Sequence, residues 1–424
     1  MKTRWRIALP GVALMVAAIV HVAEPARGFG AREPHVAPPR EPWPLVIEPT
    51  SSPARAGSGQ PQLTVEGHRA VLSWIERDGD RATLRFAEAH PSGWSEARTV
   101  ATGTNWFVNW ADVPSVIRLA GGTLAAHWLQ KSAASTYAYD VRLSFSKDDG
   151  RTWSSSITPH HDGTPTEHGF ASLFQAPGAG LGVIWLDGRA MKPHAPESDP
   201  EAGNMTVRAA TFDRDGKQLS ESLIDDRVCE CCPTAVAVTS EGALAAFRDR
   251  SPDEIRDIHV SRLAGGPWTT PAPAHRDNWK IAACPVNGPA LSARDRDVAI
   301  AWFTAQADRG HVFVAFSRDA GRSFGEAIGI EDVGALGRVD VELLADGSAA
   351  VSWIEFADGR AQFRLRRVTR DGERSPSLTA AGISANRSSG YPRMARTGST
   401  LLFAWTDTTG GASSVRTAVA HLKN

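Results

Sequence analysis

The sequence predicts an all-β protein arranged as a β-propeller of seven four-stranded repeats. Seven apolar runs end in an aromatic residue at intervals of about 50–60 residues, which is the length of one propeller blade. A polar turn and a second, alternating run follow most of them, as expected of half-buried strands. Two stacked sandwiches would not require such equal spacing. The aromatic residues are Trp74, Trp128, Trp185, Phe247, Trp302, Trp353 and Trp405.

The N-terminal segment has the pattern of a signal peptide. Lys2, Arg4 and Arg6 precede an almost wholly apolar stretch over residues 7–23. The alternative is an uncleaved anchor, because the stretch is only slightly shorter than a membrane-spanning helix. We therefore expect export to the periplasm or outside the cell. A signal peptide or N-terminal anchor would occupy residues 1–30, a Pro/Gly/Ser-rich linker 31–60, and the propeller 61–424.

Charge excludes one class of partner on electrostatic grounds. The chain has 46 Lys and Arg residues against 47 Asp and Glu residues, for a net charge of -1. Nucleic-acid binding normally requires a basic excess, so no nucleic-acid partner is expected. No membrane contact is expected beyond an N-terminal anchor.

Each repeat begins with a short apolar run before the aromatic one, which predicts the innermost strand of a blade. After Trp405 only one further strand fits before the chain ends. The missing outer strand of the seventh blade is therefore expected from the segment near residues 44–48. Such a closure would lock the ring and remove its free edges.

Two turn motifs recur at the same phase of the repeat. Residues 146–153 read SKDDGRTW, which fits the pattern S-x-D-x-G-x-T-W, and residues 317–324 read SRDAGRSF. An Asp two residues before a Gly suits a tight turn, since its carboxylate accepts turn N–H groups. The chain thus resembles the sialidase (BNR/Asp-box) superfamily over roughly residues 60–424. The resemblance implies that Asp148 and Asp319 make turns on the face away from the active site.

The same resemblance implies six blades as the alternative to seven, and an exo-sialidase-type glycoside hydrolase as one function. A hydrolase of this type would use an arginine cluster, an acidic pair and a tyrosine nucleophile. Arg338 and Arg393, with Arg189 or Arg250, and Tyr391 are the candidates. Where the family carries an Arg in an R-I-P-x-L segment, this chain has Asp112.

Loops between blades and between the second and third strands share one face of a propeller, around the channel mouth. On these loops we predict a site for a glycan or small anionic ligand, and this binding role is the favoured function. His160 and His161 are expected to be solvated. The predicted ligand-binding residues are Trp110, Asp112, His168, Arg189, Arg248 and Asn287.

All four cysteines fall on two consecutive loops of this face. Cys229, Cys231 and Cys232 precede the fourth repeat, and Cys284 precedes the fifth. Two disulfides would suit an exported protein, and two of the three pairings join Cys284 to Cys231 or Cys232. Alternatively, the thiolates bind Cu(I) or Zn, with His168 as an extra ligand. A third interpretation makes Cys229 and Cys232 a redox pair.

Overall fold

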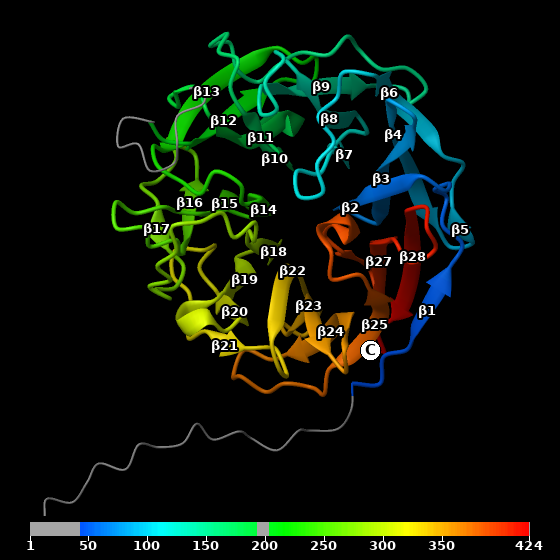
Figure 1. Cartoon of the computed structure of the whole chain (residues 1–424), viewed down its shortest axis with the longest axis vertical. Helices are drawn as coiled ribbons and strands as arrows, with labels where there is room; N and C mark the ends of the chain where they lie inside the picture. The colour runs from blue at the N-terminus through cyan, green and yellow to red at the C-terminus, as the bar shows by residue number, and fades with distance from the viewer. Residues whose placement is uncertain (1–42, 193–202, 424) are drawn as a thin grey trace, which may run out of the picture. The chain divides into compact units, whose positions relative to one another are not determined.

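A computed structural model describes residues 43–192 and 203–423. The expected signal peptide and the first part of the expected linker lie outside the described residues. Within these ranges the chain forms seven antiparallel sheets that follow one another around a ring (Figure 1). The seven-bladed prediction is confirmed, and the six-bladed alternative is wrong. Among the described residues, no helix has the length and hydrophobicity needed to cross a bilayer.

The blades are consecutive in sequence, and in the first six the strand nearest the axis comes first. The first blade contains β2 (Ser58–Glu66), β3 (Arg69–Asp78), β4 (Arg81–His90), β5 (Gly93–Trp94) and β6 (Arg98–Gly103). The second contains β7 (Ser115–Arg118), β8 (Leu124–Lys131) and β9 (Tyr139–Ser146). The third contains β10 (His168–Gln175), β11 (Leu181–Asp187), β12 (Thr206–Phe212) and β13 (Gln218–Asp225). The fourth contains β14 (Ala235–Thr239), β15 (Gly242–Arg248), β16 (Ile258–Leu263) and β17 (Ala272–Pro273).

The remaining blades repeat this order. The fifth contains β18 (Ala290–Arg294), β19 (Asp297–Thr304), β20 (His311–Ser317) and β21 (Ile328–Gly329). The sixth contains β22 (Ala335–Leu343), β23 (Ala349–Ala357), β24 (Arg360–Val368) and β25 (Leu378–Ile383). The seventh contains β26 (Arg393–Thr397), β27 (Thr400–Asp407), β28 (Ser414–His421) and β1 (Ile47–Thr50). In the described part of the chain, three short 3-10 turns lie in loops: η1 (Pro177–Ala179), η2 (Gln306–Asp308) and η3 (Arg387–Ser389).

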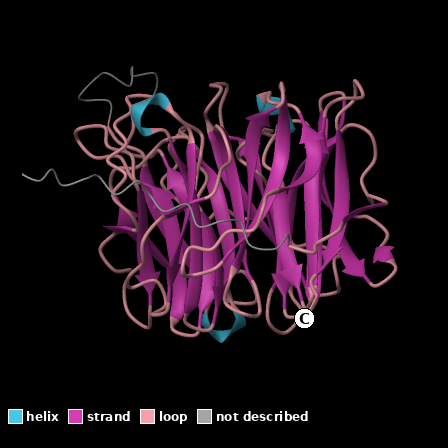
Figure 2. Ribbon diagram, turned by 90° about the horizontal axis from the view of Figure 1, so that it is seen from below, coloured by secondary structure: helices cyan, strands magenta, loops and turns pink. Residues whose placement is uncertain are grey.

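The strands cross the thickness of the ring, so that loops gather at its two rims (Figure 2). The second blade departs from four full strands. Its outer position is held by a single antiparallel bridge between Leu143 and Ile157 instead of a regular strand.

The ring closes by pairing its two ends. β1 lies antiparallel to β28, with Ile47 opposite Ala420 and Thr50 opposite Thr417. Just before β1, Trp43 and Leu45 are buried in a core cluster that includes Phe403. The expected closure is thus present. It also means that β1 and the start of β2 lie within residues 31–60, the stretch expected to be a linker.

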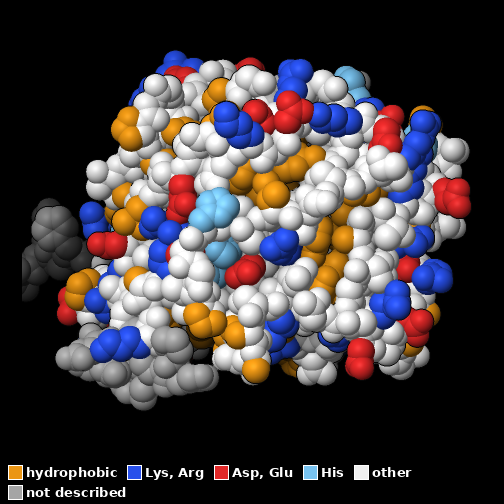
Figure 3. Space-filling model, turned by 90° about the horizontal axis from the view of Figure 1, so that it is seen from above, with side chains coloured by type: hydrophobic (Ala, Val, Ile, Leu, Met, Phe, Trp, Pro, Cys, Tyr) orange, Lys and Arg blue, Asp and Glu red, His pale blue; other side chains and the backbone are white. Residues whose placement is uncertain are grey.

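The core lies between neighbouring blades and is built from the aromatic strands. Trp74, Trp185, Trp302 and Trp353 are fully buried, as is Phe247. These strands have alternating side chains that face the blades on either side. On the side of the ring shown in Figure 3, Lys and Arg side chains lie interspersed with Asp and Glu side chains.

Asp148 and Asp319 stabilise the Asp-box turns, as the family resemblance implies. The Asp148 carboxylate accepts hydrogen bonds from the backbone N–H groups of Arg151 and Thr152, at 3.1 and 2.9 Å. Asp319 accepts one from Ser323 in the same way. These bonds hold the pKa of Asp148 down to about 2. Gly150 has φ +80, and a Cβ there would collide with Phe86, so only glycine fits.

Candidate functional site at the channel mouth

The inner strands of all seven blades, and the residues just before them, line a cavity of about 210 Å³ at the ring axis. Three residues predicted from the sequence meet there although they are far apart in the chain: Asp112, Tyr391 and Arg393. Asp340 and Glu342 of β22 also line it. The closure of the ring therefore brings aromatic, cationic and carboxyl groups to one place.

Arg393 is the cationic group of this cavity. Its guanidinium carbon lies 5.3 Å from the centre of the Tyr391 ring. Burial raises the pKa of Asp340 and lowers that of Arg393, and the opposite charges of the two groups partly offset both shifts. The Asp340 oxygens also accept the N–H groups of Val341 and Met394, both at 2.9 Å. These bonds hold the Asp340 carboxyl group in place at the channel wall.

Burial sets the protonation of the channel carboxyls. It raises the pKa of Asp112 to about 7 and that of Glu342 to about 8. It raises the pKa of Asp340 as well. At pH 6 the first two groups are therefore mostly protonated, and protonated carboxyls can donate hydrogen bonds to hydroxyl groups.

Trp110 lies at the mouth of the channel beside Tyr391. The two rings are stacked with centroids 6.0 Å apart. Arg338 lies 4.8 Å from the Trp110 ring centre and Arg387 lies 5.9 Å from it. A second cavity, of about 270 Å³, adjoins Trp110 between the first and seventh blades.

Arg338 and Asn287 hold this arrangement in place. Arg338 has φ +54, a conformation rare for residues other than glycine. Its backbone N–H donates to the Asn287 Oδ1 at 2.8 Å, and its Nη1 donates to the Ser389 hydroxyl at 2.7 Å. Both residues are buried. The strained backbone thus aims the Arg338 side chain at the Trp110 ring.

Tyr391 is largely enclosed. Its hydroxyl donates to the backbone oxygen of Val286 at 2.5 Å. Burial raises its pKa to about 12, while the charges of Arg338, Arg393 and Arg248 act in the opposite direction. No carboxylate accepts its proton among the hydrogen bonds of the described residues.

A different tyrosine, Tyr139, is paired with a carboxylate as the family resemblance implies for the nucleophile. The Tyr139 hydroxyl lies 2.6 Å from Glu167 Oε1 and 3.1 Å from Asp112 Oδ2. Tyr139 is fully buried, and burial raises the pKa of Glu167 to about 8. The sequence pointed to Tyr391 as the nucleophile, because sequence alone does not show which tyrosine lies beside an acidic side chain.

The other predicted arginines have protein partners. Arg189 pairs with Asp187 at 2.8 Å, and Arg250 pairs with Glu254 at 2.7 Å and with Glu230. Arg248 is buried and donates to three backbone oxygens, those of Asn287, Arg256 and Phe303. These three residues do not line the axial cavity.

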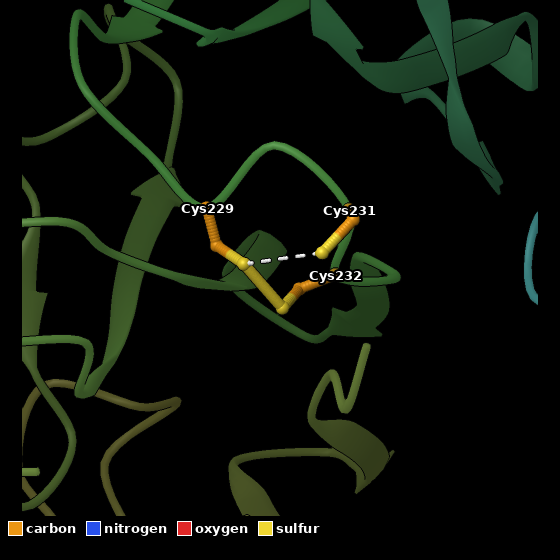
Figure 4. A group of neighbouring side chains, drawn as sticks. All are labelled: Cys229, Cys231 and Cys232. Carbon is orange, nitrogen blue, oxygen red and sulfur yellow. Dashed lines mark hydrogen bonds between the residues drawn. A yellow bond between two sulfur atoms is a disulfide. The ribbon is translucent and has the colours of Figure 1, made fainter. Parts of the chain in front are cut away.

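The four cysteines form two disulfides. Cys229 is bonded to Cys232, and Cys231 is bonded to Cys284 across the loops of the fourth and fifth blades. Figure 4 shows the first bond, with the Cys231 sulfur 3.9 Å from that of Cys229. The stapled-loop interpretation is confirmed. The Cys229–Cys232 disulfide joins the same two cysteines that the redox interpretation pairs.

His168 does not join the cysteines. It stacks on His160 with ring centroids 3.8 Å apart, among Asp140, Asp162 and Asp187. The expectation that His160 is solvated is wrong, because only 5% of it is exposed. His161 is exposed as expected. The burial of His160 could not be predicted from the sequence, because an irregular loop lacks the alternating pattern that indicates which side chains point inward.

Solved structures share this fold at low sequence identity. A Dyadobacter fermentans protein of unknown function matches with a TM-score of 0.52 and 10% identity, covering 90% of this chain and 99% of that one. A Hadza microbial sialidase matches with a TM-score of 0.50 and 16% identity, covering 80% and 73%. The polysaccharide lyase Uly1 matches with a TM-score of 0.50 and 11% identity, covering 86% and 90%.

No curated protein matches the sequence. A family model described as a BNR repeat-like domain matches residues 67–403, which is most of the ring. The propeller fold and the Asp-box turns agree with that match. The chain belongs to the BNR repeat-like domain family.

Proposed function

We propose that this protein is an exported, sialidase-like propeller that binds a small carboxylated carbohydrate at the channel mouth. The observation that carries the proposal is the convergence of Arg393, Tyr391 and Asp112 on one axial cavity. At about 210 Å³, this cavity is smaller than the roughly 300–1,000 Å³ of a drug-sized pocket. A single sugar residue suits that size better than a long oligosaccharide.

The chemistry of the lining supports this ligand class. A guanidinium can bind a carboxylate through two parallel hydrogen bonds. Protonated Asp112 and Glu342 can hydrogen-bond to hydroxyls without repelling an anion. Two structures with this fold are described as a sialidase and a polysaccharide lyase, so the fold serves carbohydrate chemistry elsewhere.

Calorimetric titration tests the proposal. Purified protein is titrated with glucuronate, N-acetylneuraminate and neutral galactose at pH 6 and pH 9. We expect a carboxylated sugar to bind more tightly than galactose. We expect Arg393→Met to weaken that binding by about 10–100-fold, because a charged hydrogen bond is lost. Binding should also weaken at pH 9, where Asp112 and Glu342 are ionised and repel the anion.

Arg416→Met is the matched control. Arg416 lies on β28 with 57% of its side chain exposed and pairs with Asp407. This variant should bind as the wild type does. If none of the three sugars binds, or if Arg393→Met binds with unchanged affinity while remaining folded by circular dichroism, the proposal is wrong.

A second candidate is glycoside hydrolysis of sialidase type, favoured by the 2.6 Å contact between Tyr139 and Glu167. A tyrosine paired with a carboxylate is the nucleophile that the family resemblance implies. Turnover of a fluorogenic sialoside that is lost in Tyr139→Phe but kept in Tyr391→Phe would establish it. Loss in Tyr391→Phe alone would assign the role to Tyr391 instead. No turnover in the wild type would leave binding as the function.

The cysteine loop adds a proposed metal role under reducing conditions. Sulfurs bound to one tetrahedral zinc at about 2.3 Å would lie roughly 3.8 Å apart, close to the 3.9 Å between Cys229 and Cys231. Reduction would supply thiolates for Zn or Cu(I). A free-thiol count with a metal assay on native and reduced protein tests this. Absence of metal from reduced protein with four free thiols would exclude it.

A further inference from the structure

A second cluster of ligating side chains lies away from the cysteines, between the second and third blades. Asp140 is in β9, His160 and Asp162 are in the following loop, and His168 begins β10. We propose that Asp140, His160 and His168 form a zinc-binding site, with Asp162 orienting both imidazoles. This site is independent of the sugar site proposed above.

The strongest indication is a pair of buried imidazoles with unused nitrogens. His168 is 0% exposed, and among the described residues neither of its ring nitrogens makes a hydrogen bond. His160 is 5% exposed, and its Nε2 also has none. A buried polar atom without a partner costs free energy, so such atoms call for a specific explanation. A cation bound by the lone pairs of these nitrogens would supply one.

Asp162 fixes which nitrogens can bind a metal. His160 Nδ1 lies 3.1 Å from Asp162 Oδ2, and His168 Nε2 lies 3.3 Å from the same oxygen. The first contact is a hydrogen bond, and a small rotation of the His168 ring would let its Nε2 donate to the same oxygen. Histidine ligands of metals commonly donate their other N–H to a carboxylate in this way. The lone pairs left are those of His160 Nε2 and His168 Nδ1.

Those two lone-pair nitrogens lie near the oxygen of another carboxylate. Asp140 Oδ1 is 3.8 Å from His160 Nε2 and 3.6 Å from His168 Nδ1. Both separations are too long for hydrogen bonds. Zinc ligands at about 2.0–2.2 Å in a tetrahedron lie roughly 3.3–3.6 Å apart. Asp140 Oδ1 is therefore spaced from each nitrogen roughly as two ligands of one ion would be. The two rings are stacked with their planes 6° apart, so one imidazole must turn for both lone pairs to point at that ion.

Local charge supports a cation. Asp140, Asp162 and Asp187 all lie within 4 Å of His168. Within the described ranges, Arg189 is the one guanidinium in ion-pair contact with these carboxylates, and it binds Asp187 through two hydrogen bonds of 2.8 Å. Asp187 is thus committed to Arg189 and to Trp185, 2.7 Å away. Asp140 remains as the carboxylate ligand.

The donor set selects the ion. Two imidazoles and one carboxylate suit zinc, whereas calcium and magnesium prefer oxygen donors alone. Three protein ligands leave a fourth position for water, the pattern of zinc sites that activate water.

The test uses the full chain, purified without reductant so that the disulfides stay closed. Protein treated with a chelator and desalted is titrated with Zn²⁺ by calorimetry, and with Co²⁺ by visible absorption. We expect one ion per chain and a cobalt spectrum without thiolate charge-transfer bands. His160→Ala and His168→Asn should abolish binding, and Asp162→Asn should weaken it by about 10–100-fold.

His161→Ala is the matched control, because His161 adjoins His160 but is exposed and contacts Gln218. It should bind zinc as the wild type does. Asp140→Asn, at a partly exposed position, tests the carboxylate if a histidine variant does not fold. Folded wild type that takes up no zinc would overturn the proposal. So would equal binding in His160→Ala, or a cobalt spectrum with thiolate bands, which would place the ion at the cysteines.

Discussion

Asp112 illustrates how burial decides the charge of one side chain in the channel wall. It is 1% exposed, and its Oδ2 accepts a hydrogen bond from Tyr139 at 3.1 Å. Desolvation outweighs this bond and raises the pKa from 3.8 to about 7. The sequence shows an acid where the family pattern has an arginine, but it could not show that burial would keep this acid protonated up to about pH 7.

This shift has a defined effect on stability. Between about pH 4 and pH 7 the unfolded chain loses the Asp112 proton while the folded chain keeps it, so stability falls as the pH rises. Asp112→Asn cannot ionise and still accepts the Tyr139 bond. It should therefore gain on the order of 2–4 kcal/mol over the wild type above pH 7, and less near pH 4.

Urea unfolding across this pH range measures the difference. Asp80→Asn, at an exposed turn between β3 and β4, is the control and should show no such gain. A constant difference between Asp112→Asn and wild type at all pH values would show that Asp112 is ionised throughout.

At the scale of elements, the loops before β14 and β18 depend on a disulfide between them. Cys231 and Cys284 are 53 residues apart, whereas Cys229 and Cys232 are three apart. Chain entropy predicts a larger effect for the longer loop. Replacing Cys231 and Cys284 by Ala should cost about 4 kcal/mol of unfolding free energy, and replacing Cys229 and Cys232 about 2 kcal/mol.

Urea unfolding without reductant compares the two double variants directly. A larger loss for the Cys229/Cys232 pair would mean that local packing, not the link between blades, dominates. The sequence placed all four cysteines on adjacent loops, and the structure confirms it. The sequence could not show which cysteines pair, because three pairings satisfy the same spacing.

The sequence predicted the regular strands better than the side-chain clusters that join strands to irregular loops. The inner and aromatic strands have clear alternation, so their positions were predictable. The Asp140–His160–His168 cluster was not, because it joins a strand end, a loop and the next strand across two blades. The only signal in the sequence was the position of His168 just before the inner strand of a repeat. That position did not reveal that His160, in an irregular loop, would lie beside it.

At the scale of the whole molecule, the closure at β1 holds the two ends of the ring together. Trp43 is 9% exposed and packs beside the seventh blade, while Val46 nearby is 68% exposed. Trp43→Ala should therefore lower the free energy of unfolding by about 3–5 kcal/mol.

Thermal and urea unfolding would detect this loss, and Val46→Ala should change stability by no more than about 0.5 kcal/mol. Equal effects of the two variants would show that the closure contributes nothing to the ring. The closure was predictable because the last repeat lacked one strand and an apolar segment near residues 44–48 could supply it.

The central claim is that a closed ring gathers Arg393, Tyr391 and Asp112 into a site for a carboxylated sugar. A crystal structure of the protein soaked with glucuronate or N-acetylneuraminate tests it most directly. The account predicts sugar density in the axial cavity, with the carboxylate on Arg393. Density only beside Trp110 in the cavity between the first and seventh blades, or none at saturating sugar, would contradict it.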